Sequence, residues 1–161
     1  MPEPRVFSFR LGEELAQAFA RHGVEYLFIG KAGAIFLGFP DTTQDADVFP
    51  EKTPENGRRI AAALRELGFS IDDRQEAELL RGKDFVQVRT GPFDVDLIFA
   101  PDGIETFAGA KRRARLVDGK FPVASLVDII QSKRAANRQK DRESLPRLEA
   151  FLQYLRERGE A

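Results

Sequence analysis

Residues 28–49, FIGKAGAIFLGFPDTTQDADVF, place an apolar segment, a glycine and a second short apolar segment in close succession. The largely apolar residues 24–29 end at Gly30 and predict a buried strand. Residues 32–38 predict a short helix, which Gly38 and Pro40 end. A junction of strand, glycine and helix presents backbone N–H groups to an anion such as a phosphate. This stretch therefore predicts an α/β element with an anion-binding turn.

Two acidic pairs lie inside strand-like segments. Asp45 comes directly before a strand predicted over 46–49, and Asp47 lies within it. Asp94 and Asp96 lie within the apolar run FDVDLIF. Side chains two residues apart on a strand point to the same face, and acidic residues are unfavourable in strands. Such a face is either exposed to water or faces a cation. If the two strands are neighbours, three or four carboxylates converge, and a hard divalent cation such as Mg²⁺ suits that arrangement.

Alternating strand and helix patterns continue along the chain and favour an α/β or α+β fold. Thr53 and Pro54 are typical of a helix start, Ser125 is a candidate N-cap, and Pro146 is compatible with a helix only in its first turn. The predicted helices are 12–22, 54–67, 125–136 and 144–158; the predicted strands are 69–71, 83–90 and 92–99; and 107–117 is predicted as a helix that passes into a strand before a turn at Asp118-Gly119. We expect a mixed, twisted sheet with flanking helices and further helices at the C-terminus.

Length and composition favour one domain. The chain has 161 residues, of which 42% are hydrophobic, so residues 1–161 suffice for a single domain. We expect its core over about 12–124 and a helical part over about 125–158. The formal net charge is −1, but residues 111–142 hold ten Lys or Arg against three Asp. That basic segment is either a polyanion-binding surface or a solvated helix face.

Several classes of protein are excluded or disfavoured. The sequence contains no cysteine, which excludes disulfides, thiolate catalysis and Cys-type zinc sites. It shows no basic-then-apolar targeting pattern at its start and no apolar run of membrane-spanning length. We therefore expect a cytoplasmic protein without membrane partners.

Two motifs resemble the nucleotidyltransferase superfamily, which has the DNA-polymerase-β-like fold. The first is residues 28–49, with the apolar strand, the glycine turn and the apolar-flanked Asp-x-Asp. The second is residues 125–148, SLVDIIQSKRAANRQKDRESLPRL, which is similar to a later motif of Lys, Arg and a basic residue before Asp. The resemblance spans about residues 20–155 and looks closest to a minimal bacterial branch of toxin–antitoxin or abortive-infection type.

The resemblance implies a site with two Mg²⁺ ions and a nucleoside triphosphate such as ATP. Asp45, Asp47 and Asp96 would be the catalytic and metal-ligating carboxylates, with Asp94 as the alternative to Asp96. Asp96 would lie nearest the acceptor hydroxyl and act as its base. The residues implied to bind nucleotide are Gly30, Lys31, Thr43, Lys133 and Arg138, and Lys140 and Asp141 complete the later motif.

Two departures from the family pattern leave two functions open. Lys31 stands where the family has a second Gly or a Ser, and Asp41 stands where the branch usually has an arginine. The first hypothesis is an enzyme that moves NMP from an NTP to a hydroxyl of tRNA, of a protein or of an aminoglycoside, with a cognate toxin or antitoxin as a partner. The second is an inactive module of the same fold that acts by protein contact, as an antitoxin or a scaffold.

Overall fold

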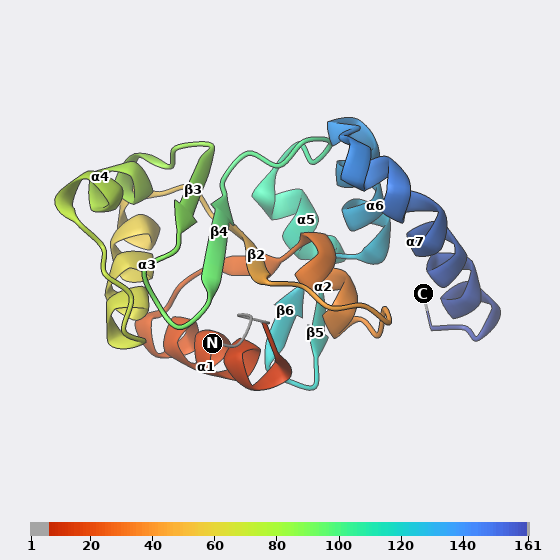
Figure 1. Ribbon diagram of the computed structural model, residues 1–161, viewed down its shortest axis with the longest axis horizontal. Coiled ribbons are helices and arrows are strands. Elements are labelled where there is room, and N and C mark those ends of the chain that lie inside the picture. The colour runs from red at the N-terminus through yellow and green to blue at the C-terminus, as the bar shows by residue number, and fades with distance from the viewer. Residues whose placement is uncertain (1–6, 161) are drawn as a thin grey trace, which may run out of the picture.

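A computed structural model describes residues 7–160, which form a six-stranded sheet surrounded by helices (Figure 1). The helices are α1 (Phe9–His22), α2 (Gly30–Phe36), α3 (Pro54–Glu66), α4 (Asp73–Arg81), α5 (Phe107–Arg113), α6 (Leu126–Ala136) and α7 (Gln139–Glu157). The strands are β1 (Tyr26–Phe28), β2 (Asp45–Pro50), β3 (Phe85–Val88), β4 (Asp94–Ile98), β5 (Arg115–Val117) and β6 (Phe121–Val123). The predicted α/β class with a mixed sheet and flanking helices is confirmed.

The strand order across the sheet is β3-β4-β2-β1-β6-β5. The pairs β2–β4 and β1–β6 are parallel, whereas β1–β2, β3–β4 and β5–β6 are antiparallel. Because β2 lies between β1 and β4, its residues face neighbours on both sides. The two acidic pairs therefore lie on adjacent strands in the middle of the sheet.

Short polar side chains begin most of the helices. Thr53 accepts a hydrogen bond from the backbone N–H of Asn56 at the start of α3, and Ser125 accepts one from Asp128 at the start of α6. Both contacts satisfy N–H groups that have no partner inside the helix, and both helix starts were predicted. Gly23 and Gly82 end α1 and α4 in the left-handed conformation that glycine favours.

The strand predicted over 69–71 is wrong. Phe69 and Ile71 are buried but belong to no strand, and Phe69 packs edge-on against the ring of Phe93. Their apolar character thus reflects contact with the core rather than sheet pairing. The following helix, α4, was not predicted, although Asp72 caps it by accepting a hydrogen bond from the N–H of Gln75.

The last helix begins at Gln139 rather than near Ser144, so Pro146 lies inside it and not in its first turn. The start is fixed by Asp141, whose fully buried carboxylate accepts a 3.1 Å hydrogen bond from the backbone N–H of Arg138. This N-terminal contact stabilises the extra turns. Pro146, which has no N–H, leaves one helix hydrogen bond unmade.

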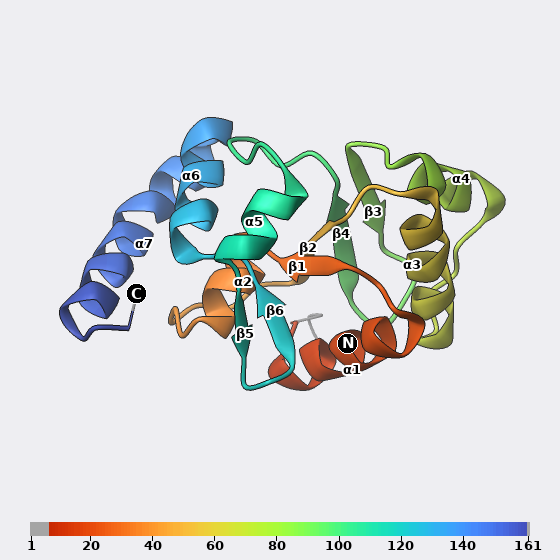
Figure 2. The same ribbon diagram turned by 180° about the vertical axis from the view of Figure 1, so that it is seen from behind.

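Two groups of buried apolar side chains hold the elements together. The larger includes the sheet and the fully buried rings of Phe19, Phe28, Phe93 and Phe121. The smaller one, which we call the C-terminal cluster, joins α2, α6 and α7; its buried members are Ala34, Phe39, Leu126, Ile130, Leu148 and Leu155. Figures 1 and 2 both show α6 and α7 at one end of the molecule and α3 and α4 at the other. Within residues 7–160, no helix has the length and apolarity needed to cross a membrane.

Candidate functional site

Asp45 and Asp47 on β2 lie directly beside Asp94 and Asp96 on β4. The parallel register pairs Asp45 with Asp94 and Asp47 with Asp96, which confirms that the two acidic strands are neighbours. Asp96 is 7% exposed, and its Oδ1 has no hydrogen-bond partner in the part of the chain that the structure describes. A buried carboxylate oxygen without a partner is costly, so this atom marks a place where a cation or a donor is expected.

The pKa values of two of these carboxyl groups are raised. Burial raises the pKa of Asp47 to about 7, and the negative charges of Asp96 and Asp45 add to the effect, while Lys133 and Lys140 oppose it. Burial also raises the pKa of Asp96 to about 6, with Asp45 again adding to the rise. Like charges held together in a partly dry environment favour the protonated form unless a cation balances them.

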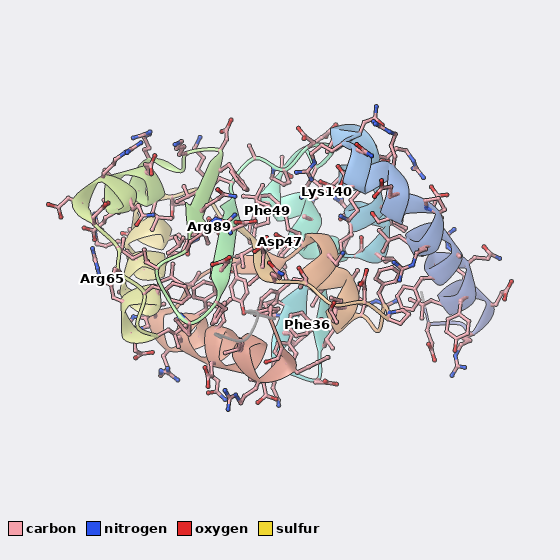
Figure 3. The ribbon with its side chains drawn as sticks, in the orientation of Figure 1. Phe36, Asp47, Phe49, Arg65, Arg89 and Lys140 are labelled. Carbon is pink, nitrogen blue, oxygen red and sulfur yellow. The ribbon has the colours of Figure 1, made fainter. Side chains whose placement is uncertain are left out.

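Arg89 provides part of that balance. Its Nη1 lies 2.8 Å from Asp94 Oδ2 and 3.8 Å from Asp45 Oδ1, so one guanidinium contacts carboxylates from two strands. Figure 3 labels Arg89, Asp47 and Lys140, which lie over the middle of the molecule. No motif in the sequence singles out Arg89. The only signal was its position just after β3, whose antiparallel pairing with β4 brings it to the acidic strand.

The carboxylates do not form a ready-made metal site. Among residues 7–160, no three His, Cys, Asp or Glu side chains are arranged to hold a metal ion, so the expected convergence on a common point is not met. Like charges on the carboxylates repel one another, and Arg89 attracts Asp45 and Asp94 instead. The donor set still fits Mg²⁺ in its chemistry, because it offers carboxylate oxygens from adjacent strands and the unpartnered Asp96 Oδ1.

We call Asp45 and Asp47 on β2 and Asp94 and Asp96 on β4 the acidic row. Gly30 allows α2 to begin against this row. Its φ is +61°, and a Cβ built there would lie 2.5 Å from Asp47 Oδ2. In addition, the N–H of Ile29 donates to the carbonyl of Asp47 over 3.0 Å. Only glycine combines this backbone conformation with so close an approach.

Lys133 on α6 is the buried cation of the site. Its side chain is 14% exposed, and its Nζ lies 3.6 Å from Asp141 Oδ1. Burial lowers the pKa of Lys133, while the charges of Asp141 and Asp47 act in the opposite direction. Arg138, in contrast, is largely exposed and donates from Nε to Asp141 over 2.8 Å. Asp141 therefore holds two of the three cations of the later motif, Lys133 and Arg138, at the start of α7.

Lys31 and Asp41, the two departures from the family pattern, contact each other. Lys31 Nζ lies 3.4 Å from Asp41 Oδ2, and Arg147 Nη1 lies 3.4 Å from the same oxygen. The unusual lysine and the unusual acid thus neutralise one another at the side of α7.

Thr43 has a backbone role. Its hydroxyl accepts from the N–H of Asp45 over 3.4 Å and donates to the carbonyl of the same residue over 3.3 Å. These bonds shape the start of β2 just before the acidic pair.

Comparison with known proteins identifies the fold. No family model and no curated protein sequence matches this chain. Four chains of solved structures match it, including the following two. One is TM1012 from Thermotoga maritima, assigned as a nucleotidyltransferase, with a TM-score of 0.57 and 17% identity over 89% of this chain and 92% of that one. The other is the antibiotic-resistance factor ANT(2'')-Ia, with a TM-score of 0.59 and 17% identity over 89% of this chain and 83% of that one.

The chain has the nucleotidyltransferase fold. At this level of identity the likeness concerns the fold and not the reaction. The acidic row of β2 and β4, the glycine turn before α2 and the buried Lys133 are the features of this nucleotidyltransferase fold that bear on chemistry.

Proposed function

We propose that this chain is a Mg²⁺-dependent nucleotidyltransferase that moves NMP from an NTP to a hydroxyl group. The observation that carries the proposal is the pairing of Asp45 and Asp47 with Asp94 and Asp96 across parallel strands, with one buried oxygen of Asp96 left without a partner. A structural acidic patch has no reason to bury an unsatisfied carboxylate in the middle of a sheet.

Asp45, Asp47 and Asp96 would hold two Mg²⁺ ions. When bound, Mg²⁺ neutralises charge on the phosphates and lowers the pKa of the acceptor hydroxyl. Asp96, whose unpartnered Oδ1 is offered to the metal, would accept the hydroxyl proton through its carboxylate group. The acceptor oxygen then forms a bond to the α-phosphorus while the bond between that phosphorus and the bridging oxygen breaks, and pyrophosphate leaves with the NTP's β- and γ-phosphates.

Basic side chains from α6 and α7 would bind the triphosphate. Lys133 is suited to this role because it is buried beside the acidic row and its charge reaches Asp47. Lys140 acts on both Asp47 and Asp96 through its charge and would meet the same anion. Gly30 keeps the start of α2 open to phosphate, whereas Lys31, Thr43 and Arg138 contribute through the segments they hold in place.

The acceptor classes to examine are tRNA, protein and aminoglycosides. The basic segment 111–142 favours a polyanionic acceptor, although Lys111, Arg113 and Lys120 within it are already paired with acids. Aminoglycosides are an acceptor class expected from the sequence resemblance, and the similarity to an antibiotic-resistance factor supports testing them. A role in a toxin–antitoxin pair rests on the sequence resemblance alone.

The test is label transfer from each α-³²P-labelled NTP in the presence of Mg²⁺ to tRNA, to cellular protein and to aminoglycosides. We expect transfer by the wild-type protein and by Asp102→Ala, a control that removes an exposed carboxylate in the loop after β4, outside the acidic row. Asp47→Ala should lower the rate by about 100-fold or more, the scale seen when a group that stabilises the transition state is removed. It should remain folded, because loss of one carboxylate relieves repulsion.

The second candidate, an inactive module acting by protein contact, is favoured by one observation. The ion pairs of Asp41 with Lys31 and Arg147 occupy cations next to α2 that an anionic substrate would otherwise attract. The same experiment decides between the two. A wild-type protein that neither transfers label nor binds any NTP supports the module and contradicts the enzyme.

A further inference from the structure

The guanidinium of Arg89 lies against the acidic row, yet the proposed reaction gives it no role. We propose that Arg89 is an internal counter-cation, which competes with the divalent metal for Asp45 and then binds the anionic substrate once the metal is present. This inference rests on the proposed function and adds a residue to its site.

The two contacts of Arg89 differ in strength. The 2.8 Å contact to Asp94 is a charge-assisted hydrogen bond, and Asp94 is only 18% exposed in its side chain. The 3.8 Å contact to Asp45 is an ion pair without a hydrogen bond, and the side chain of Asp45 is 34% exposed. Asp94 therefore anchors Arg89, while the weaker contact to Asp45 can be exchanged at little cost.

Arg89 neutralises only part of the acidic row. Its charge reaches Asp96, whose pKa it acts to lower, but Asp96 Oδ1 remains buried and receives no hydrogen bond from any described residue. The remaining unsatisfied oxygen is an independent sign that a further cation belongs there. Metal and Arg89 thus share one set of carboxylates.

Charge and geometry give Arg89 a second role. A divalent ion that draws Asp45 away leaves Arg89 bound to Asp94 at one edge of the site. Lys133 lies at the opposite edge, because β3 and β4 lie on one side of β2 whereas α6, which carries Lys133, packs with α2. A guanidinium presents several N–H donors in a plane that matches phosphate oxygens. Anions bound over the acidic row would then meet cations from both sides.

The test measures Mn²⁺ binding by electron paramagnetic resonance in wild type, Arg89→Gln and the control Arg115→Gln. Arg115 is an exposed arginine on β5, at the other edge of the sheet. Removing one positive charge close to the ion should tighten Mn²⁺ binding by about tenfold in Arg89→Gln at low salt, and by less than about twofold in Arg115→Gln. With saturating Mn²⁺, Arg89→Gln should bind a non-hydrolysable ATP analogue about fivefold more weakly than wild type.

Arg89→Lys is the second variant and protects the test against a folding defect. It keeps the positive charge but replaces the guanidinium, whose Nη1 contacts both Asp94 and Asp45, with a compact ammonium, so its Mn²⁺ affinity should lie between those of wild type and Arg89→Gln. Equal, measurable Mn²⁺ affinities in all variants would overturn the counter-cation and leave the proposed function standing. Unchanged analogue affinity would overturn the anion-binding role. Failure of every protein to bind Mn²⁺ would overturn both this inference and the proposed function.

Discussion

Asp47 couples the charge of the site to the stability of the protein. Its pKa is raised from 3.8 to about 7 in the folded chain, first by burial and then by neighbouring carboxylates. Between those pH values the folded state holds a proton that the unfolded state has released. The contribution of Asp47 to stability is therefore lost as pH rises from about 4 to about 7.

Asp47→Asn should remove this pH dependence. We expect the free energy of unfolding at pH 8, with EDTA present, to exceed that of wild type by about 1–3 kcal/mol, a range reduced for the partial exposure of the carboxylate. The difference should shrink as pH falls below about 4, where wild-type Asp47 becomes protonated in both states. Urea denaturation at pH 5 and pH 8 measures it, with Asp102→Asn as control. An advantage of the same size at both pH values would contradict the raised pKa.

Residue spacing was sufficient to predict the acidic row but not its cation. Side chains alternate along a strand, so Asp45 and Asp47, like Asp94 and Asp96, had to share a face. The sequence predicts an acidic site only on the condition that the two strands are neighbours, and the pairing of β2 with β4 meets that condition. Arg89 was missed because its place depends on the register between β3 and β4. No local pattern in the sequence encodes that register.

The junction of β1 with α2 is the element on which the site depends most. Gly30→Ala would place a Cβ against the Asp47 carboxylate in a left-handed backbone conformation. We expect it to lower the free energy of unfolding by about 1–3 kcal/mol and to weaken Mn²⁺ binding. Gly119→Ala is the matched control, because Gly119 has a φ of +69° and no atom within 4 Å of its built Cβ. Equal losses for the two variants, in urea denaturation, would show that the approach to Asp47 has no cost.

Elements with local signals were predicted best. Thr53-Pro54 and Ser125 marked the starts of α3 and α6 because capping depends on a few adjacent residues. The start of α7 depends on the buried carboxylate of Asp141, which contacts Lys133 as well as Arg138. The bond to Arg138 is local, whereas the contact with Lys133 joins two helices, and the polar sequence around Asp141 gives no helical period to recognise.

The C-terminal cluster ties the basic side of the site to the rest of the molecule. Leu148, 1% exposed, lies in the cluster that joins α7 to α2 and to α6, the helix that carries Lys133. Leu148→Ala should cost about 2–5 kcal/mol of unfolding free energy, as expected for a fully buried leucine. Val127→Ala, on the exposed face of α6, should cost less than about 1 kcal/mol. Thermal and urea denaturation measure both. Equal, small losses would mean that α7 packs only loosely against α2 and α6.

The strand order has a consequence for synthesis on the ribosome. β2 meets its partner β4 only after the chain has advanced from position 47 to position 96, and β1 gains its parallel neighbour β6 still later, near position 123. Contacts so distant along the chain form slowly and late. An emerging chain therefore carries Asp45 and Asp47 before Asp96, Arg89 or Lys133 can surround them, and the carboxylates stay hydrated until most of the protein has left the exit tunnel.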